Sequence, residues 1–344
     1  MELPATGKLD QCSFNQIIYP RLGEKNPRIL LGPRHGVDAA VIDLGNQVLV
    51  VAEDPTFGMP ALLPYFGWSI VHIAASDVAV LGVKPEYLTI CLLLPPGSSP
   101  SLLEEIWEQI HQECVKLGIS IVGGHTGVYP GIGYPLNGGC TVFGFGRKEQ
   151  LTPASGARVG DCLIMTKGLA IEAAAILAIQ AAEELEKAFG GEFVSHLKDY
   201  FWKMTVVEDA LLAAPYAHAM HDATEGGFLN GVYEMAEASG IGVTVFEKDL
   251  LCDPEIAKLC QHFNIDPLIS ISEGTLLIAA PSGKAEELIK KLQDNGIPAA
   301  AVGEFTDSRR VLRRATGSEE PLRPVEVDPF WEAYFKTITK EEEK

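Results

Sequence analysis

Three aspartates near the start of the sequence stand among apolar neighbours. They are Asp38 in Gly-Val-Asp-Ala-Ala-Val, Asp54 in Val-Val-Ala-Glu-Asp-Pro-Thr, and Asp77 in Ala-Ala-Ser-Asp-Val-Ala-Val. A carboxylate held away from water without a partner costs several kcal/mol, so such surroundings require a partner for each one. A hard cation that also binds phosphate oxygens suits aspartate side chains. A cap, a turn or an ion pair is the structural alternative for each residue taken singly.

A glycine pair offers backbone amides to a phosphate. The motif Gly123-Gly124-His125-Thr126 directly follows a strand predicted over residues 119–122. The end of a strand leaves amides free, as a phosphate-binding loop requires. An ordinary turn is the structural alternative for this motif.

A second motif, His221-Asp222-Ala223-Thr224-Glu225-Gly226-Gly227, lies between a predicted strand and a predicted helix. Asp222 could reach a metal there, and Gly226 and Gly227 let the backbone approach a ligand. A capped helix start with Glu225 in its first turn is the structural alternative. The sequence contains neither a Walker loop nor a convincing strand-linked dinucleotide fingerprint, so an ATP site in this chain would have another design.

The first half of the chain predicts the strands and helices that would position these residues. A Gly-Asn turn at 45–46 joins two strands into a hairpin, which places Asp38 and Asp54 near one end of paired strands. Asp77 falls inside a helix predicted over residues 65–81. The predicted strands are 28–31, 39–42, 48–52, 87–94, 119–122 and 139–146, and a second helix covers 101–117.

The second half repeats the alternation of strands and helices, which predicts an α/β fold in two domains. A polar, turn-rich segment between Arg147 and Asp161 marks the boundary. We expect an N-terminal domain over residues 1–152, a C-terminal domain over 153–330 and a charged tail over 331–344. The second domain is predicted to contain strands 162–166, 217–222, 243–246, 275–280 and 299–302, with helices 227–238 and 284–295.

Composition excludes several classes of function. The 344 residues include 46 acidic and 27 basic ones, for a net charge of −19, and no basic stripe is available to follow a nucleic acid backbone. No apolar run is long enough to span a bilayer, and the N-terminus lacks the pattern of a signal peptide, which predicts a cytoplasmic protein without a membrane partner. The seven cysteines form no Cys-x-x-Cys pair, so reduced structural thiols are expected.

Taken in order, the motifs resemble a known superfamily. Gly-x-Asp-Ala-Ala-Val, Asp-Pro, Ser-Asp-x-x-x-x-Gly-x-x-Pro, Gly-Gly-His-Thr and Asp-Ala-Thr-Glu-Gly-Gly follow one another between about Gly32 and Gly303. The same order is found in the PurM-like superfamily, which includes aminoimidazole ribonucleotide synthetase, selenophosphate synthetase, thiamine-monophosphate kinase and the hydrogenase maturation protein HypE. The similarity to HypE is the strongest.

The resemblance implies an ATP-binding homodimer in which the N-terminal domains pair through their sheets. Asp38, Asp54, Asp77 and Asp222 would place Mg²⁺ on the phosphates. The motif Gly123-Gly124-His125-Thr126 would line the nucleotide together with Glu225, Gly226 and Gly227. Lys167 would contact a phosphate oxygen, and Lys8 would fold over the phosphates by a looser analogy with N-terminal segments of such proteins.

The chain also departs from its relatives. HypE proteins end in a cysteine that carries the group being dehydrated, whereas this chain has no cysteine after Cys260. The Gly-Asp-His-Gly of many relatives is replaced after Lys167, which leaves Glu172 as the nearby carboxylate that could act as a base. Cys12 lacks the setting of the reactive cysteine of selenophosphate synthetases. Val37 stands where thiamine-monophosphate kinases have an additional aspartate.

Three hypotheses follow for the function. The first is a Mg²⁺-dependent enzyme that transfers phosphate from ATP to a small-molecule or carboxamide-like acceptor, as HypE does, with a metalloenzyme maturation partner. The second is a small-molecule kinase of the thiamine-monophosphate kinase type, which releases a stable phosphorylated product. The third is a nucleotide-binding maturation or regulatory protein that has lost catalysis.

Overall fold

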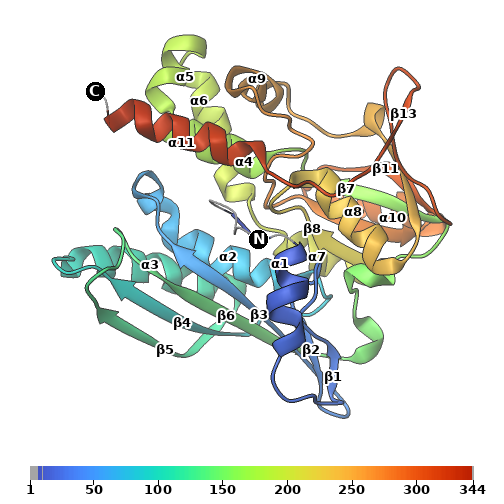
Figure 1. Cartoon of the computed structure of the whole chain (residues 1–344), viewed down its shortest axis with the longest axis horizontal. Coiled ribbons are helices and arrows are strands. Elements are labelled where there is room, and N and C mark those ends of the chain that lie inside the picture. The colour runs from blue at the N-terminus through green and yellow to red at the C-terminus, as the bar shows by residue number, and fades with distance from the viewer. Residues whose placement is uncertain (1–6, 10, 343–344) are drawn as a thin grey trace.

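The chain folds into two α/β domains, each built on a mixed sheet (Figure 1). The computed structural model describes residues 7–9 and 11–342. The N-terminal sheet has six strands in the order β1-β2-β3-β6-β4-β5, and the C-terminal sheet has seven in the order β13-β12-β9-β11-β7-β10-β8. These sheets confirm the α/β fold that the alternation of strands and helices predicts.

The N-terminal sheet contains the hairpin that the sequence predicts. Strands β2 and β3 pair antiparallel from Ala40 opposite Val51 to Asp43 opposite Val48. Within this sheet, β4 and β5 are the parallel pair. The strands are β1 (Ile29–Leu31), β2 (Ala40–Asp43), β3 (Val48–Phe57), β4 (Tyr87–Leu94), β5 (Ser120–Val128) and β6 (Asn137–Gly146).

Two helices, α2 (Phe66–Ala79) and α3 (Pro100–Leu117), lie along the N-terminal sheet (Figure 1). Helix α3 begins where the Ser99 hydroxyl accepts a hydrogen bond from the amide of Leu102, and it ends at Gly118 in a left-handed conformation. Helix α2 is apolar on almost every side and contributes a large part of the core. Asp77 is therefore carried on one of the most buried helices of the domain.

The face of the N-terminal sheet turned away from the core remains apolar and partly exposed. Tyr87 stacks on Phe143 across β4 and β6, and Phe145 is 37% exposed. At the β5 edge, Val122 and Val128 are more than half exposed. Because a sheet with an uncovered apolar face usually has a partner, this surface is available for association.

The C-terminal sheet is antiparallel except where β12 runs parallel to β9. Its strands are β7 (Asp161–Thr166), β8 (Ala219–Asp222), β9 (Gly242–Phe246), β10 (Leu276–Pro281), β11 (Ala299–Thr306), β12 (Arg310–Arg313) and β13 (Glu319–Pro321). The predicted strands 162–166, 217–222, 243–246, 275–280 and 299–302 correspond to β7, β8, β9, β10 and β11. Strands β12 and β13 form a short charged hairpin that the apolar pattern does not predict.

The helices of the second domain include the two that the sequence predicts, now α8 (Gly227–Ser239) and α10 (Ser282–Asp294). The others are α4 (Ile171–Gln180), α5 (Ala182–Phe189), α6 (Gly191–Lys198), α7 (Val207–Ala213) and α9 (Pro254–Phe263). Shorter helical turns cover residues Gln11–Ser13, Phe14–Ile18, Tyr19–Arg21, Pro60–Tyr65, Lys148–Gln150, Ala154–Gly156, Asp199–Lys203 and Glu247–Asp249. Within the residues that the structure describes, none of the helices is both long and apolar enough to cross a bilayer.

The segment expected to be a charged tail is instead largely the last helix, α11 (Pro329–Glu342), which packs on α4 (Figure 1). Phe330, Ala333 and Tyr334 are buried in the same core cluster as α4. Their spacing of three and four residues places them on one face of a helix. Charged residues follow this short apolar face in the sequence. They dominate the composition of the segment, so a prediction from composition misses the helix.

Candidate functional site

Four aspartates from both domains come together where the domains meet. Asp38 precedes β2, Asp54 lies on β3, Asp77 lies on α2 and Asp222 ends β8. Repulsion among these carboxylates contributes to the pKa values of Asp77 and Asp222, which places all four in one electrostatic cluster. We call these four residues, together with Glu273, the acid cluster.

Several oxygens of the acid cluster are buried without a hydrogen-bond partner. Among the described residues, both carboxylate oxygens of Asp222, Oδ2 of Asp54 and Oε1 of Glu273 are in this state. Asp222 is 1% exposed and Glu273 is 3% exposed. Such groups are costly unless a cation compensates them. The donor set, which consists of carboxylate oxygens, fits Mg²⁺.

The carboxylates of the acid cluster repel one another, although His221 and Lys8 partly offset their charge. Burial, together with repulsion from Asp38, raises the pKa of Asp222 to about 7. Burial and the neighbouring carboxylates also raise the pKa values of Asp77 and Glu273 well above their ordinary range. These carboxyl groups therefore favour the protonated form when no cation is present, and a bound cation would shift them to the carboxylate form.

His221 links Asp38 to the second domain. Its Nδ1 lies 2.8 Å from Oδ2 of Asp38, and its Nε2 lies 2.9 Å from Oε2 of Glu234 on α8. Burial opposes the charged imidazolium, but these two carboxylates raise the pKa of His221 well above its ordinary value. His221 also lies within 4.8 Å of the oxygens of Asp38 and Asp222, a spacing compatible with a metal site. Because both ring nitrogens already bond carboxylates, we interpret His221 as a residue that orients Asp38.

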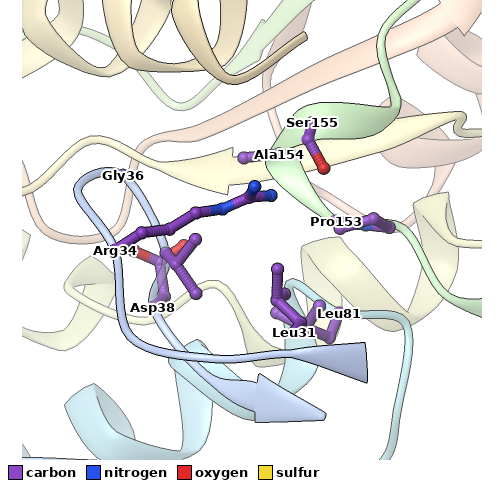
Figure 2. Close-up of a pocket in the computed structure, with 9 residues that line it drawn as sticks. Leu31, Arg34, Gly36, Asp38, Leu81, Pro153, Ala154 and Ser155 are labelled. Carbon is purple, nitrogen blue, oxygen red and sulfur yellow. The ribbon is translucent and has the colours of Figure 1, made fainter. Parts of the chain in front are cut away.

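A small pocket opens beside Asp38 (Figure 2). Figure 2 shows the Arg34 side chain extending across this pocket from the loop that precedes Asp38. Pro153, Ala154 and Ser155 approach from the opposite side. The pocket therefore lies between the N-terminal domain and the start of the C-terminal domain.

The N-terminal segment brings Lys8 to the acid cluster. The Lys8 ammonium lies 3.2 Å from Oγ1 of Thr224. Loss of water around Lys8 opposes its charge, but Glu234, Asp38 and other carboxylates hold its pKa above the ordinary value. Lys8 is thus a cation close to the acid cluster.

Glu225, Gly226 and Gly227 have their polar groups engaged within the protein. The two Glu225 oxygens accept hydrogen bonds from the indole of Trp331 and from the amide of Lys8. The Gly226 amide donates to Asp328, and the Gly227 amide donates to the carbonyl of Thr224. Gly227 starts α8 with a φ of +64°, and a Cβ there would lie 2.5 Å from the carbonyl oxygen of Ser270. The fold itself therefore requires glycine at these positions, without any ligand.

The motif Gly123-Gly124-His125-Thr126 lies inside an edge strand, which corrects the expected strand end. Strand β5 continues to Val128, and Gly124 pairs with Ile90. A Cβ on Gly124 would lie 2.0 Å from the Ile90 carbonyl oxygen, so the glycine permits close pairing where it was expected to end the strand.

The position of β5 also separates this motif from the acid cluster within one chain. The register runs from Gly124 to Ile90, then to Cys140 and then to Asp54. Gly124 is therefore three strand spacings, or about 14 Å, from Asp54. The His125 ring instead bonds the Tyr129 hydroxyl at 2.7 Å on the exposed edge.

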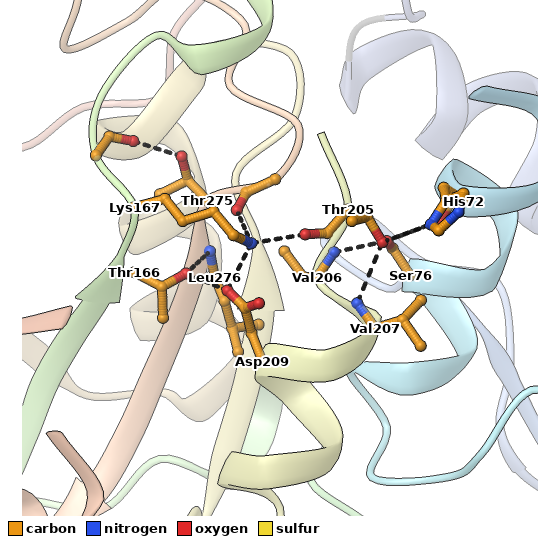
Figure 3. A network of polar contacts seen from close by, with 12 residues as sticks. His72, Ser76, Thr166, Lys167, Thr205, Val206, Val207, Asp209, Thr275 and Leu276 are labelled. Carbon is orange, nitrogen blue, oxygen red and sulfur yellow. Dashed lines mark hydrogen bonds and ion pairs between the residues drawn. The ribbon is translucent and has the colours of Figure 1, made fainter. Parts of the chain in front are cut away.

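Lys167 lies in a network of hydrogen bonds within the protein (Figure 3). Its ammonium donates to the carbonyl of Thr205 at 2.7 Å, to Oδ2 of Asp209 at 2.6 Å and to the carbonyl of Gly274 at 2.9 Å. An ammonium has three donors, so none remains for a ligand in this arrangement. The sequence shows a lysine after a strand, but it does not show these tertiary partners.

Glu172 lies beside the acid cluster, in the first turn of α4. Its Oε2 accepts a hydrogen bond from the amide of Glu273 at 3.0 Å. Burial raises the pKa of Glu172 to about 7. A carboxyl group with this pKa can accept or release a proton near neutral pH.

Two residues of the site were not predicted from the sequence. Glu273 lies in Ser-Glu-Gly-Thr just before β10, and Glu234 interrupts the apolar face of α8. An acidic residue in an apolar helical pattern is a usable signal, and it would have indicated Glu234. Glu273 lies outside the predicted strands and helices and gives no comparable signal.

The fold and the acid cluster define a two-domain α/β protein with a carboxylate site suited to a divalent cation. Family models for the AIR synthase related protein match residues 36–146 with the N-terminal domain and residues 158–314 with the C-terminal domain. The chain belongs to the AIR synthase related, or PurM-like, family.

Relatives within this family include HypE proteins. The carbamoyl dehydratase HypE of Escherichia coli is 29% identical over 286 residues, which are 80% of this chain and 82% of that protein. A crystal structure of E. coli HypE, a hydrogenase maturation protein, has a TM-score of 0.71 and 26% identity, and covers 88% of this chain and 94% of that one.

Two more distant structures share the fold. HypE in complex with ATP has a TM-score of 0.67 and 22% identity, and covers 95% of this chain and 97% of that one. The HypE-HypF complex has a TM-score of 0.66 and 19% identity, and covers 83% of this chain and 93% of that one.

Proposed function

We propose that this protein binds Mg²⁺-ATP at the acid cluster and transfers the γ-phosphoryl group to an oxygen of a small-molecule or carboxamide-like acceptor. The observation that carries the proposal is the Asp222 carboxylate, which is buried with neither oxygen hydrogen-bonded. A structural aspartate in such a position would have a hydrogen-bond partner, as Asp209 has in Lys167. A cation delivered with a nucleotide would supply that partner.

Each residue of the site then has a chemical task. Asp38, Asp54, Asp77 and Asp222 would hold Mg²⁺, which neutralises charge on the phosphates when it is bound. Lys8 would contact a phosphate oxygen as a point charge. Transfer forms a bond between phosphorus and the acceptor oxygen and breaks the bond to the β-phosphate oxygen, so ADP leaves.

Glu172 would accept a proton during the reaction. A carboxamide phosphorylated on oxygen loses its N–H proton and then its phosphate when it is dehydrated. The pKa of Glu172, about 7, lets this side chain take that proton near neutral pH. Carbamoyl dehydratase is the activity in the name of the E. coli relative, so dehydration after phosphorylation is the outcome we favour.

The acceptor would be a separate molecule. Helix α11 is docked by Phe330 and Tyr334 against α4. A segment held in this way cannot present a reacting group of its own to the acid cluster. Relatives described as hydrogenase maturation proteins, and the HypE-HypF complex, support a role in metalloenzyme maturation with a partner protein that supplies the acceptor.

A homodimer formed through the exposed sheet faces would give the Gly123-Gly124-His125-Thr126 motif a role. Within one chain this motif is three strands away from Asp54. The apolar face around Tyr87, Phe143 and Phe145 is suited to a second copy, which would bring edge strands close to the partner's domain junction. We therefore propose that this motif lines the nucleotide only in the dimer.

The decisive experiment is calorimetry of ATP binding with and without Mg²⁺, followed by a phosphate-release assay. Wild-type protein should bind ATP only with Mg²⁺, and Asp38→Asn and Asp222→Asn should each reduce affinity by about 100-fold or more. Asp43→Asn is the matched control, because Asp43 is a surface residue paired with Lys148. Lack of Mg²⁺-dependent binding by folded wild-type protein would refute the proposal.

Turnover separates the remaining hypotheses. ATP binding without phosphate release in the presence of candidate acceptors would favour a nucleotide-binding maturation protein. The bonding of Lys167 favours this non-catalytic hypothesis, because its ammonium donates all three hydrogen bonds to Thr205, Asp209 and Gly274. A stable phosphorylated acceptor would instead favour a small-molecule kinase.

A further inference from the structure

Glu225 connects the two ends of the chain. Its Oε1 accepts a hydrogen bond from Nε1 of Trp331 at 2.9 Å, and its Oε2 accepts one from the amide of Lys8 at 3.0 Å. Trp331 lies in the first turn of the last helix, and Lys8 lies more than three hundred residues before Trp331. Both carboxylate oxygens therefore serve to hold the N-terminal segment against α11.

Gly7 fits this arrangement in a way that a larger residue would not. Its φ is +86°, which favours glycine. A Cβ at this position would lie 2.2 Å from Oε1 of Glu225 and 3.3 Å from Nε1 of Trp331. The N-terminal backbone therefore passes close to the bonded pair.

The position of Trp331 is itself fixed by the start of α11. Asp328 accepts hydrogen bonds from the amide of Phe330 at 2.9 Å and from the amide of Gly226 at 2.8 Å. Phe330 and Tyr334 are buried against α4. Helix α11 is thus bound both to the core and to the segment that contains Glu225.

The held segment directs the Lys8 side chain toward the acid cluster. Within the described residues, the ammonium makes one hydrogen bond, to Thr224 at 3.2 Å. It interacts electrostatically with Glu234, Asp38 and Asp77. Lys167, by comparison, donates all three of its hydrogen bonds to the protein. Of these two lysines, Lys8 is therefore the one with donors left for a phosphate among the described residues.

We propose that Trp331 and Glu225 are positioning residues, which anchor the Gly7-Lys8 segment so that the Lys8 ammonium meets the phosphates of the nucleotide. This proposal rests on the proposed function for its ligand. It assigns a role to the last helix, which would act on the nucleotide through Lys8 without touching it. Loss of the indole N–H would release one side of the anchor while leaving the packing of α11 in place.

The first test measures anchoring without any nucleotide. Acetylation of Lys8 by acetic anhydride can be followed by mass spectrometry in wild type, Trp331→Phe and Gly7→Ala. We expect Lys8 to react roughly three times faster or more in both variants, because a released segment samples open conformations. Trp107→Phe makes the same change on the exposed surface of α3 and should leave the rate unchanged. An unchanged rate in Trp331→Phe and Gly7→Ala would overturn the proposal.

The second test asks whether Trp331 acts through Lys8. Trp331→Phe should weaken Mg²⁺-ATP binding by roughly 5- to 10-fold, the effect of one lost hydrogen bond. In a Lys8→Met background the same change should have little further effect, because the group it positions is absent. Equal losses in both backgrounds would show a general structural role and overturn the proposal.

These tests also separate this proposal from the proposed function. If wild type binds no ATP, the proposed function fails, and the phosphate contact of Lys8 fails with it. The acetylation rates would then still decide whether Trp331 and Gly7 hold the segment. If wild type binds ATP and the two backgrounds respond equally to Trp331→Phe, the positioning proposal fails alone.

Discussion

Two regions at the domain junction bury charge in opposite ways. Around Lys167, the ammonium and the Asp209 carboxylate are only 2.6 Å apart, and Thr166 donates a further hydrogen bond to Asp209 (Figure 3). In the acid cluster, Asp222 is equally buried, but neither of its oxygens has a hydrogen-bond partner, and Nδ1 of His221 lies 3.8 Å from its Oδ1. A buried charge with all its hydrogen bonds made supports the architecture, whereas one without any hydrogen bond indicates a binding site.

The Lys167 network also crosses between the domains. His72 on α2 bonds Thr205 at 3.0 Å and Glu113 at 3.1 Å, while the Thr205 carbonyl accepts from Lys167. The Ser76 hydroxyl accepts a hydrogen bond from the amide of Val206. Because these groups satisfy one another, the network fixes α2, and with it Asp77, against the second domain.

The largest expected effect is a loss of stability when the Lys167 network loses the Asp209 carboxylate. Asp209→Asn leaves the Lys167 ammonium buried without its counter-charge, so we expect the free energy of unfolding to fall by about 3 to 5 kcal/mol. Urea denaturation of the metal-free protein measures this change. A loss under 1 kcal/mol, the size expected of a surface pair, would remove the distinction between the two regions.

The matching change in the acid cluster should have the opposite sign. Asp222→Asn removes a buried charge that has no hydrogen-bond partner, so the metal-free protein should gain about 1 to 2 kcal/mol of unfolding free energy at pH 8. The same urea denaturation measures it. A variant that unfolds more easily than wild type without metal would show that Asp222 has a structural partner.

A smaller effect is expected at the residues that orient Asp38. His221→Gln removes the link between Asp38 and Glu234 but keeps all the carboxylates, so Mn²⁺ affinity should fall by about 10- to 100-fold. Electron spin echo spectroscopy of bound Mn²⁺ should show no directly coordinated nitrogen in wild type. Coupling to an imidazole nitrogen would instead identify His221 as a metal ligand.

The smallest expected effect is the pH dependence of stability that Glu172 contributes. Its pKa in the folded protein is about 7, above the ordinary value, so the folded state binds more protons than the unfolded state at intermediate pH. The stabilising contribution is therefore complete at acidic pH and is lost as pH rises through 7. Metal-free wild type should lose about 1 to 2 kcal/mol more than Glu172→Gln between pH 5 and pH 8. Equal losses in urea denaturation would contradict the shift.

The sequence predicts the acid cluster better than it predicts the glycine motifs. Asp38, Asp54 and Asp77 could be found because a carboxylate among apolar neighbours requires a partner. Their strands and helix could be predicted because the periodicity of such elements is a local pattern. The hairpin of β2 and β3 was predicted for the same reason. Local patterns of this kind are sufficient to predict strands and helices. From those elements, Asp38 and Asp54 could be placed near one end of paired strands.

Long-range partners could not be predicted in this way. The three acceptors of Lys167 come from Thr205, Asp209 and Gly274, which are distant in the sequence. The length of β5 beyond the glycine pair depends on its pairing with β4. The role of Trp331 depends on two chain ends meeting at Glu225, which no local pattern contains.

The most direct test of the acid cluster is the position of a bound cation. Crystals grown with Mn²⁺ and a non-hydrolysable ATP analogue would reveal the metal by its anomalous scattering. Our account predicts metal density in contact with the Asp222 carboxylate, with further ligands from Asp38, Asp54 or Asp77 and from phosphate oxygens. Nucleotide density with no metal beside Asp222, or metal bound only at other carboxylates, would contradict it.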